Sequence, residues 1–157
     1  MAEHRGAVVR HDTIKDMPDI PSGINCMGAA MTDKKSVLVV GLDPTLIDFS
    51  DPGYPPGMST TKVLAGIKSS EDELTRLGYS VQTCLTDFGE TAEAVVQNHL
   101  KQKGFDCVLI GAGVRLNPSN FFLFEKLVNV VHEGAPQAKL CFNQLPSDIP
   151  EAVKRWL

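Results

Sequence analysis

The sequence predicts an α/β fold in which one parallel sheet of four strands, in the order 2-1-3-4, lies between two layers of helices. Stretches of strand character alternate four times with stretches of helical periodicity. Two of the strand stretches, 36–44 and 105–113, contain unbroken apolar runs, which is typical of strands covered on both faces. These two strands therefore take the centre of the sheet, between the more alternating stretch 79–85 and the short stretch 139–143.

Composition and charge exclude several classes of protein. The chain is 43% hydrophobic and 22% charged, as in ordinary globular proteins. Its formal net charge is -4 and its basic residues are scattered, so we expect no nucleic-acid partner. No apolar run approaches the roughly 18 residues of a membrane-spanning helix, and the first residues lack the pattern of a signal peptide. We therefore expect no membrane contact and a cytoplasmic location.

The first thirty residues differ from the rest of the chain in composition and periodicity. Prolines and glycines punctuate residues 1–30, which show little periodicity apart from the strand-like piece 6–10. We expect a poorly ordered N-terminal extension there and a single α/β domain over residues 31–157. Met31 precedes a short polar lead into the first strand and is a candidate alternative start.

The elements of the first half follow from local signals. After the first strand, the proline-rich and glycine-rich stretch 45–59 predicts a loop that is long for this class of fold. Thr60 or Thr61 is expected to cap a helix that ends at Gly78. A second helix is expected over 90–103, where apolar residues recur at helical spacing.

The second half contains a helix with an unusually wide apolar stripe. This helix is expected from about Asn120 to Glu133, with Gly134 ending it. Its stripe covers about half of the circumference, while Phe122 lies on the polar side. The stripe predicts either a deeper core or a contact between subunits. A last helix is expected after Ser147, where Asp148 and Pro150 are typical of a helix start.

Polar residues and glycines gather where strands of the predicted sheet end. In the order 2-1-3-4 the chain reverses direction between strands one and three, and such a reversal places a ligand crevice at the carboxyl ends of the strands. Glycines at this edge allow close approach of a backbone, and an arginine there suits a carboxylate or phosphate. The sequence therefore predicts a site for an anionic small molecule, formed by Gly111, Gly113, Arg115, Asp43, Asp87 and Asn143.

Each of these residues has a structural alternative. Asp43 and Asp87 would bind a divalent cation or act as an acid and base pair, or Asp43 would form a turn before Pro44 and Asp87 would cap the next helix with Glu90. Arg115 would grip the anion or pair with one of the two aspartates. The pattern assigns no catalytic residue, no metal ligand and no cofactor.

The cysteines and one histidine are expected in the core. The four cysteines lack any Cys-x-x-Cys pair, and three fall in predicted strands, where a thiol acts as a small hydrophobe: Cys26, Cys84, Cys107 and Cys141. His99 lies on the apolar stripe of its helix and is expected to have a hydrogen-bond partner there.

The run 37–40 followed by Asp43 and Pro44 resembles the first strand of response-regulator receiver domains. Only one acid is present, and the phosphoaccepting aspartate and the fifth strand with its lysine are missing, so phosphotransfer is not expected. From Met31 to Leu157 the chain resembles a group of small bacterial flavodoxin-like proteins without an assigned activity. That resemblance rests on Asp43-Pro44, on 86–92 and 111–115, on 123–125 and 131–132, and on Ala135-Pro136 and Phe142-Asn143.

Two functions are compatible with these patterns. The first is a small protein that binds an anionic small molecule at the strand ends. The second is an interaction module without catalysis, acting through a protein partner or as a homodimer formed by the helix 120–133.

Overall fold

Four parallel strands form the sheet of this protein. The computed structural model describes residues 33–157. The strands are β1 (Ser36–Leu42), β2 (Ser80–Thr86), β3 (Cys107–Ile110) and β4 (Lys139–Phe142), and neighbours pair in the order β2-β1-β3-β4. The predicted fold class, a four-stranded flavodoxin-like sheet in the order 2-1-3-4, is confirmed.

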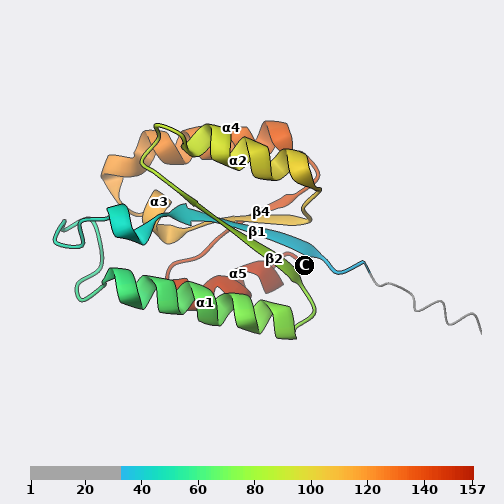
Figure 1. The fold of residues 1–157 in the computed structure, drawn as a ribbon, viewed down its shortest axis with the longest axis horizontal. Coiled ribbons are helices and arrows are strands. Elements are labelled where there is room, and N and C mark those ends of the chain that lie inside the picture. The colour runs from blue at the N-terminus through green and yellow to red at the C-terminus, as the bar shows by residue number, and fades with distance from the viewer. Residues whose placement is uncertain (1–32) are drawn as a thin grey trace, which may run out of the picture. The chain divides into compact units, whose positions relative to one another are not determined.

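Helices cover both faces of the sheet (Figure 1). The helices α2 (Ala92–Gln102) and α4 (Phe121–Gly134) lie side by side on one face, and α1 (Thr60–Arg76) and α5 (Ile149–Lys154) lie on the other. A four-residue helix follows β3, and three 3-10 turns stand in the connections: α3 (Ala112–Arg115), η1 (Pro44–Leu46), η2 (Pro118–Asn120) and η3 (Pro146–Asp148).

The central strand β1 separates two hydrophobic cores. Because side chains alternate along a strand, Leu38 and Val40 pack with residues of α2 and α4. Val37 and Val39 point to the other face and pack with residues of α1 and α5. The apolar run that predicted a strand buried on both faces therefore serves one core on each side.

Several predicted boundaries are wrong by one to three residues. The cap of α1 is Ser59 rather than Thr60 or Thr61, and its hydroxyl accepts a hydrogen bond from the N–H of Lys62 at 3.3 Å. The helix α2 begins at Ala92 rather than residue 90. The strand β3 ends at Ile110, because Gly111 is already the cap of α3.

Most of the apolar stripe of α4 belongs to the core, whereas Phe121 at its start is exposed. Its buried members pack against the sheet and α2: Leu123, Leu127, Val130 and Val131. Phe122 is exposed, as predicted. Gly134 is the last helical residue rather than the residue after the helix, and a Cβ there would lie 2.8 Å from Cδ1 of Leu100. A glycine at this position lets α4 lie close to α2.

Residues Lys34–Leu157 form one compact unit. The predicted extension 1–30, its strand-like piece 6–10, Cys26 and the candidate start at Met31 lie outside the described residues. Within the described part, no helix has the length and apolar character that crossing a membrane requires.

Candidate functional site

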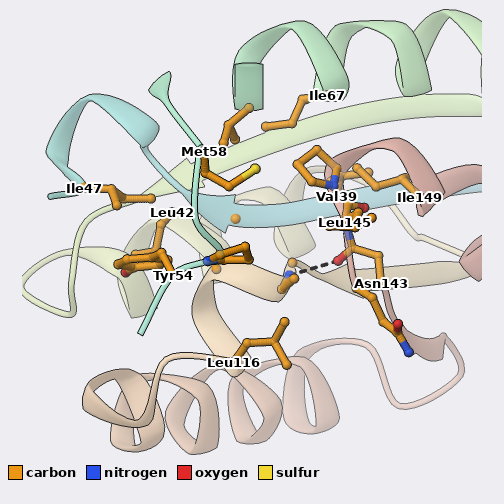
Figure 2. A pocket seen from close by; sticks show the side chains of 18 of the residues that line it. Val39, Leu42, Ile47, Tyr54, Met58, Ile67, Leu116, Asn143, Leu145 and Ile149 are labelled. Carbon is orange, nitrogen blue, oxygen red and sulfur yellow. Dashed lines mark hydrogen bonds between the residues drawn. The ribbon is translucent and has the colours of Figure 1, made fainter. Parts of the chain in front are cut away.

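A cavity of about 90 Å³ lies at the carboxyl ends of β1 and β3 (Figure 2). The chain leaves β1 toward one edge of the sheet and β3 toward the other. The cavity therefore occupies the switch point at which open α/β sheets hold their ligands. Its position agrees with the crevice that the sequence predicted.

The lining of the cavity is mostly apolar. Among the described residues that line it, none carries a charged side chain. The sheet contributes Val39, Val40, Gly41, Leu42, Leu85 and Leu109, and the segments around it contribute Ile47, Phe49, Met58, Val63, Ile67 and Ile149. The polar side chains of the lining are those of Tyr54, Asn143 and Gln144.

Gly111 keeps the ends of the two central strands together. Its N–H donates to the carbonyl of Val40 at 2.7 Å, and a Cβ on Gly111 would lie 3.2 Å from that same oxygen. A side chain here would push β3 away from β1. Gly111, which the sequence assigned to an anion site, is thus also required for the close approach of the ends of β1 and β3.

Asn143 connects the turn after β3 to the turn after β4. Its Oδ1 accepts from the N–H of Ala112 at 2.9 Å, and its Nδ2 donates to the carbonyl of Leu145 at 2.7 Å. The residue is 4% exposed. Because both ends of the carboxamide are bonded to backbone, Asn143 shapes the rim of the cavity.

The loop between η1 and α1 covers the cavity. Ile47, Tyr54 and Met58 point their apolar parts toward it (Figure 2). Polar bonds on the outer side hold the loop to η2: Asn120 Nδ2 donates to the Tyr54 hydroxyl at 3.2 Å and Asn117 Nδ2 donates to Asp51 at 3.4 Å. The long loop is therefore an ordered cover over the strand ends.

Arg115 lies beside the cavity rather than in its lining. Its Nη2 donates to the carbonyl of Asn143 at 2.9 Å, and its guanidinium lies 5.8 Å from the ring centre of Phe142. The expected alternative, a pair with Asp43 or Asp87, is wrong. The buried Nε of Arg115 has no hydrogen-bond partner among the described residues.

Asp43 forms the turn after β1. Its Oδ1 accepts from the N–H of Thr45 at 2.9 Å and from the Thr45 hydroxyl at 2.7 Å, so Asp43 caps η1. These two bonds, the hydroxyl first, lower the pKa of Asp43. The turn-forming alternative is confirmed, and Asp43 is not among the described residues that line the cavity.

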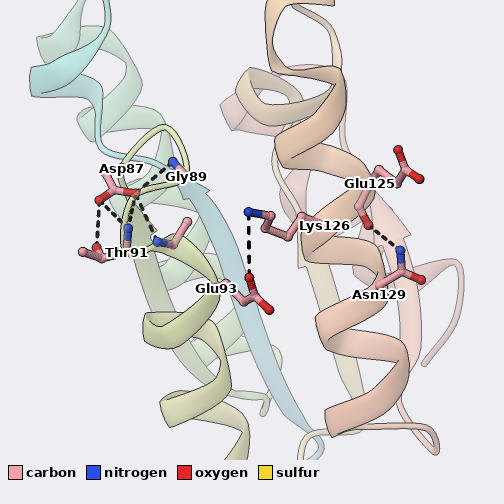
Figure 3. Close-up of polar contacts among 8 residues, drawn as sticks. Asp87, Gly89, Thr91, Glu93, Glu125, Lys126 and Asn129 are labelled. Atoms are coloured by element: carbon pink, nitrogen blue, oxygen red, sulfur yellow. Dashed lines mark hydrogen bonds and ion pairs between the residues drawn. The ribbon is translucent and has the colours of Figure 1, made fainter.

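Asp87 holds the start of α2 (Figure 3). Its carboxylate accepts from the N–H groups of Gly89, Thr91 and Ala92 and from the Thr91 hydroxyl, at 2.8 to 3.1 Å. The backbone bond from Gly89, followed by the Thr91 hydroxyl, lowers the pKa of Asp87. Asp87 thus bonds the start of α2 as the capping alternative expected, but the N-cap residue is Thr91, and the expected capping box with Glu90 does not appear among the bonds of the described residues.

The structure thus gathers part of the predicted set. Three of the predicted residues line the cavity: Gly111, Gly113 and Asn143. Arg115 does not line it but donates a hydrogen bond to the carbonyl of Asn143. Asp43 and Asp87 bond the turns that follow β1 and β2. Anion binding by these residues stays a prediction. Sequence reasoning missed the apolar residues of the covering loop, although four of them in one loop are a signal of burial: Ile47, Phe49, Tyr54 and Met58.

Comparison with known proteins adds no assignment to this geometry. No protein-family model matches the chain, and no curated protein matches it.

Proposed function

We propose that this protein binds a small, mostly apolar and uncharged molecule in the cavity beneath the loop 47–58. The observation that carries the proposal is a mostly apolar cavity at the switch point of the sheet, whose described lining residues include no charged side chain. Ionised ligands are costly to bury without a paired charge. An uncharged ligand fits this lining better than a free anion does.

The volume limits the size of the ligand. An apolar cavity of about 150 Å³ can hold benzene, so about 90 Å³ accommodates a compact aliphatic group of a few carbon atoms. A larger ligand requires the loop 47–58 to move outward. The amide of Asn143 and the hydroxyl of Tyr54 are already hydrogen-bonded to the protein. The polar side chain of the lining that is available to such a ligand is therefore that of Gln144, which is exposed.

Arg115 supports a second candidate, the anion site predicted from the sequence. Its buried Nε–H lacks a partner among the described residues, and a guanidinium donor left unpaired is a natural ligand for a carboxylate or phosphate. The two candidates use different residues, so one titration series separates them.

The test is an NMR titration of the full chain with xenon, isobutanol, inorganic phosphate and citrate. We expect xenon and isobutanol to shift the amide signals of residues that line the cavity, such as Gly41 and Gly113. Phosphate or citrate shifts centred on Arg115 and lost in Arg115→Ala would favour the anion site instead.

A matched pair of variants locates the binding. Val63 lines the cavity, whereas its neighbour Leu64 is exposed on the same helix. Val63→Phe fills the cavity and should abolish the response to xenon and isobutanol, while Leu64→Phe should keep it. Equal responses from both folded variants would refute the proposal, and thermal unfolding shows that both are folded.

A further inference from the structure

A second surface, on the α2 and α4 side of the sheet, exposes large apolar side chains. Its members are Leu46, Phe88, Phe121 and Phe122, and we refer to them as the aromatic face. They are 53%, 46%, 59% and 78% exposed. Leu46, Phe88 and Phe122 line one groove, and the rings of Phe121 and Phe122 lie 5.5 Å apart. Contiguous exposed apolar groups typically mark an interaction site.

The fold holds these side chains outward. Phe88 stands in the turn between β2 and α2, where Asp87 bonds the start of the helix and Gly89 takes a φ of 126°. Phe122 lies in the first turn of α4, on the side opposite the stripe that enters the core. Neither side chain can enter the core without unwinding the start of a helix.

Three acidic side chains line the two grooves beside Phe88 and Phe122. Asp48 and Asp51 line the groove on one side of Phe88 and Phe122, and Glu90 lines the groove on the other side. Lys126 is the basic residue lining these two grooves, and its Nζ lies 3.8 Å from Oε2 of Glu93 (Figure 3). The hydroxyl of Ser50, followed by its N–H, lowers the pKa of Asp48.

We propose that the aromatic face docks a segment of another protein that presents an apolar anchor side chain flanked by lysine or arginine. The two grooves beside Phe88 and Phe122, of about 390 and 280 Å³, offer room for the anchor. The carboxylates at their edges complement a basic flank. A second copy of this chain is disfavoured, because a two-fold contact through the same patch brings its carboxylates together.

The test uses three fluorescein-labelled twelve-residue peptides with a central Leu-Trp pair, flanked by lysine, serine or glutamate. Fluorescence anisotropy with the full chain should show the lysine peptide binding about tenfold more tightly than the serine peptide, from two or three ion pairs at the edge. The glutamate peptide should not bind, and the advantage of the lysine peptide should shrink as salt rises.

Variants of the aromatic face and of its edge make the test specific. Phe122→Ser should abolish binding of the lysine peptide, whereas Trp156→Ser, at a residue 55% exposed beyond α5, should leave it unchanged. The double variant Asp48→Asn, Glu90→Lys should shift the preference from the lysine peptide to the glutamate peptide. A surface that binds apolar peptides non-specifically would not change its preference for the charge of the flanking residues.

Several outcomes would overturn the proposal. They are equal affinity for the three peptides, no binding of the lysine peptide at millimolar concentration, and binding that survives Phe122→Ser. Light scattering over a range of protein concentrations tests whether a second copy of this chain occupies the aromatic face instead. A dimer that dissociates in Phe122→Ser would assign the aromatic face to a second copy of the chain.

Discussion

Gly66 of α1 lies against Pro146 of η3, and a Cβ on Gly66 would come within 2.7 Å of the Cβ of Pro146. The hydroxyl of Ser70, one turn further along α1, donates to the carbonyl of Pro146 at 2.7 Å. Both Pro146 and Ile67, the neighbour of Gly66, line the cavity. The spacing between α1 and η3 therefore sets the width of the cavity on this side.

The same substitution at two glycines should have opposite effects on stability. Gly66→Ala should lower the free energy of unfolding by about 1 to 3 kcal/mol, because the added methyl forces α1 away from Pro146. Gly113→Ala should raise it by about 0.5 to 1 kcal/mol, since Gly113 is helical and a Cβ there meets open space. Urea unfolding of the two variants measures both values, and a shared sign would contradict the packing described here.

Asn143 should contribute strongly to stability. Asn143→Ala leaves the N–H of Ala112 and the carbonyl of Leu145 without their side-chain partner, at a cost of about 1 to 3 kcal/mol. Gln144→Ala, at the exposed neighbouring residue, should change stability by less than about 0.5 kcal/mol. Urea titrations that gave the two variants the same midpoint would show that the bridge between the turns is unimportant.

Stability should fall in acid because of Asp43 and Asp87. Hydrogen bonds lower the pKa of both carboxyls in the folded protein, so their stabilisation is fully present above the ordinary aspartate pKa of about 3.9. It is lost as the pH falls from there through the lowered values. Asp87→Asn should reduce this loss and lower the melting temperature at pH 7.

The control for this acid effect is Asp33→Asn, the same change at an exposed residue. Melting temperatures of the parent and both variants between pH 2 and pH 7 test the assignment. A parent and an Asp87→Asn protein with parallel pH profiles would exclude Asp87 as a source of the acid dependence.

The cysteines of the described domain should be unreactive in the folded protein. Cys84, Cys107 and Cys141 are free and buried, as predicted, and burial raises the pKa of the Cys84 thiol to about 11. The sulfurs of Cys107 and Cys141 lie 3.3 Å apart as a hydrogen-bonded pair of thiols. In a Cys26→Ser protein, a thiol reagent at pH 7 should therefore label three cysteines only after denaturation. Rapid labelling of the native protein would contradict this burial.

The arrangement of the sheet could be predicted because burial on both faces leaves a trace in composition. The apolar runs 37–40 and 107–110 place β1 and β3 in the centre, and the topology of the switch point then locates the cavity. Local sequence signals predicted the ends of the elements less accurately. Gly111 and Gly113 suggested a longer strand, whereas the chain turns into α3 directly after Ile110.

The side chains around the cavity were harder to predict. A residue at the end of a strand is near the site, but its direction depends on which local donor satisfies it. Asp43 turns to Thr45, Asp87 turns to the start of α2, and Arg115 turns to the carbonyl of Asn143. These partners compete with a ligand, and position along the sequence does not reveal which of them prevails.

The lining of the cavity has a consequence for the order of events in folding. Its residues run from Val39 on β1 to Ile149 on α5, so the site exists only after strands far apart in the chain have paired and the last helix has docked. An unfinished chain that lacks β4 and α5 has no such cavity. A bound molecule would therefore slow the opening of the whole domain, and the amount bound would measure the fraction of chains that have completed folding.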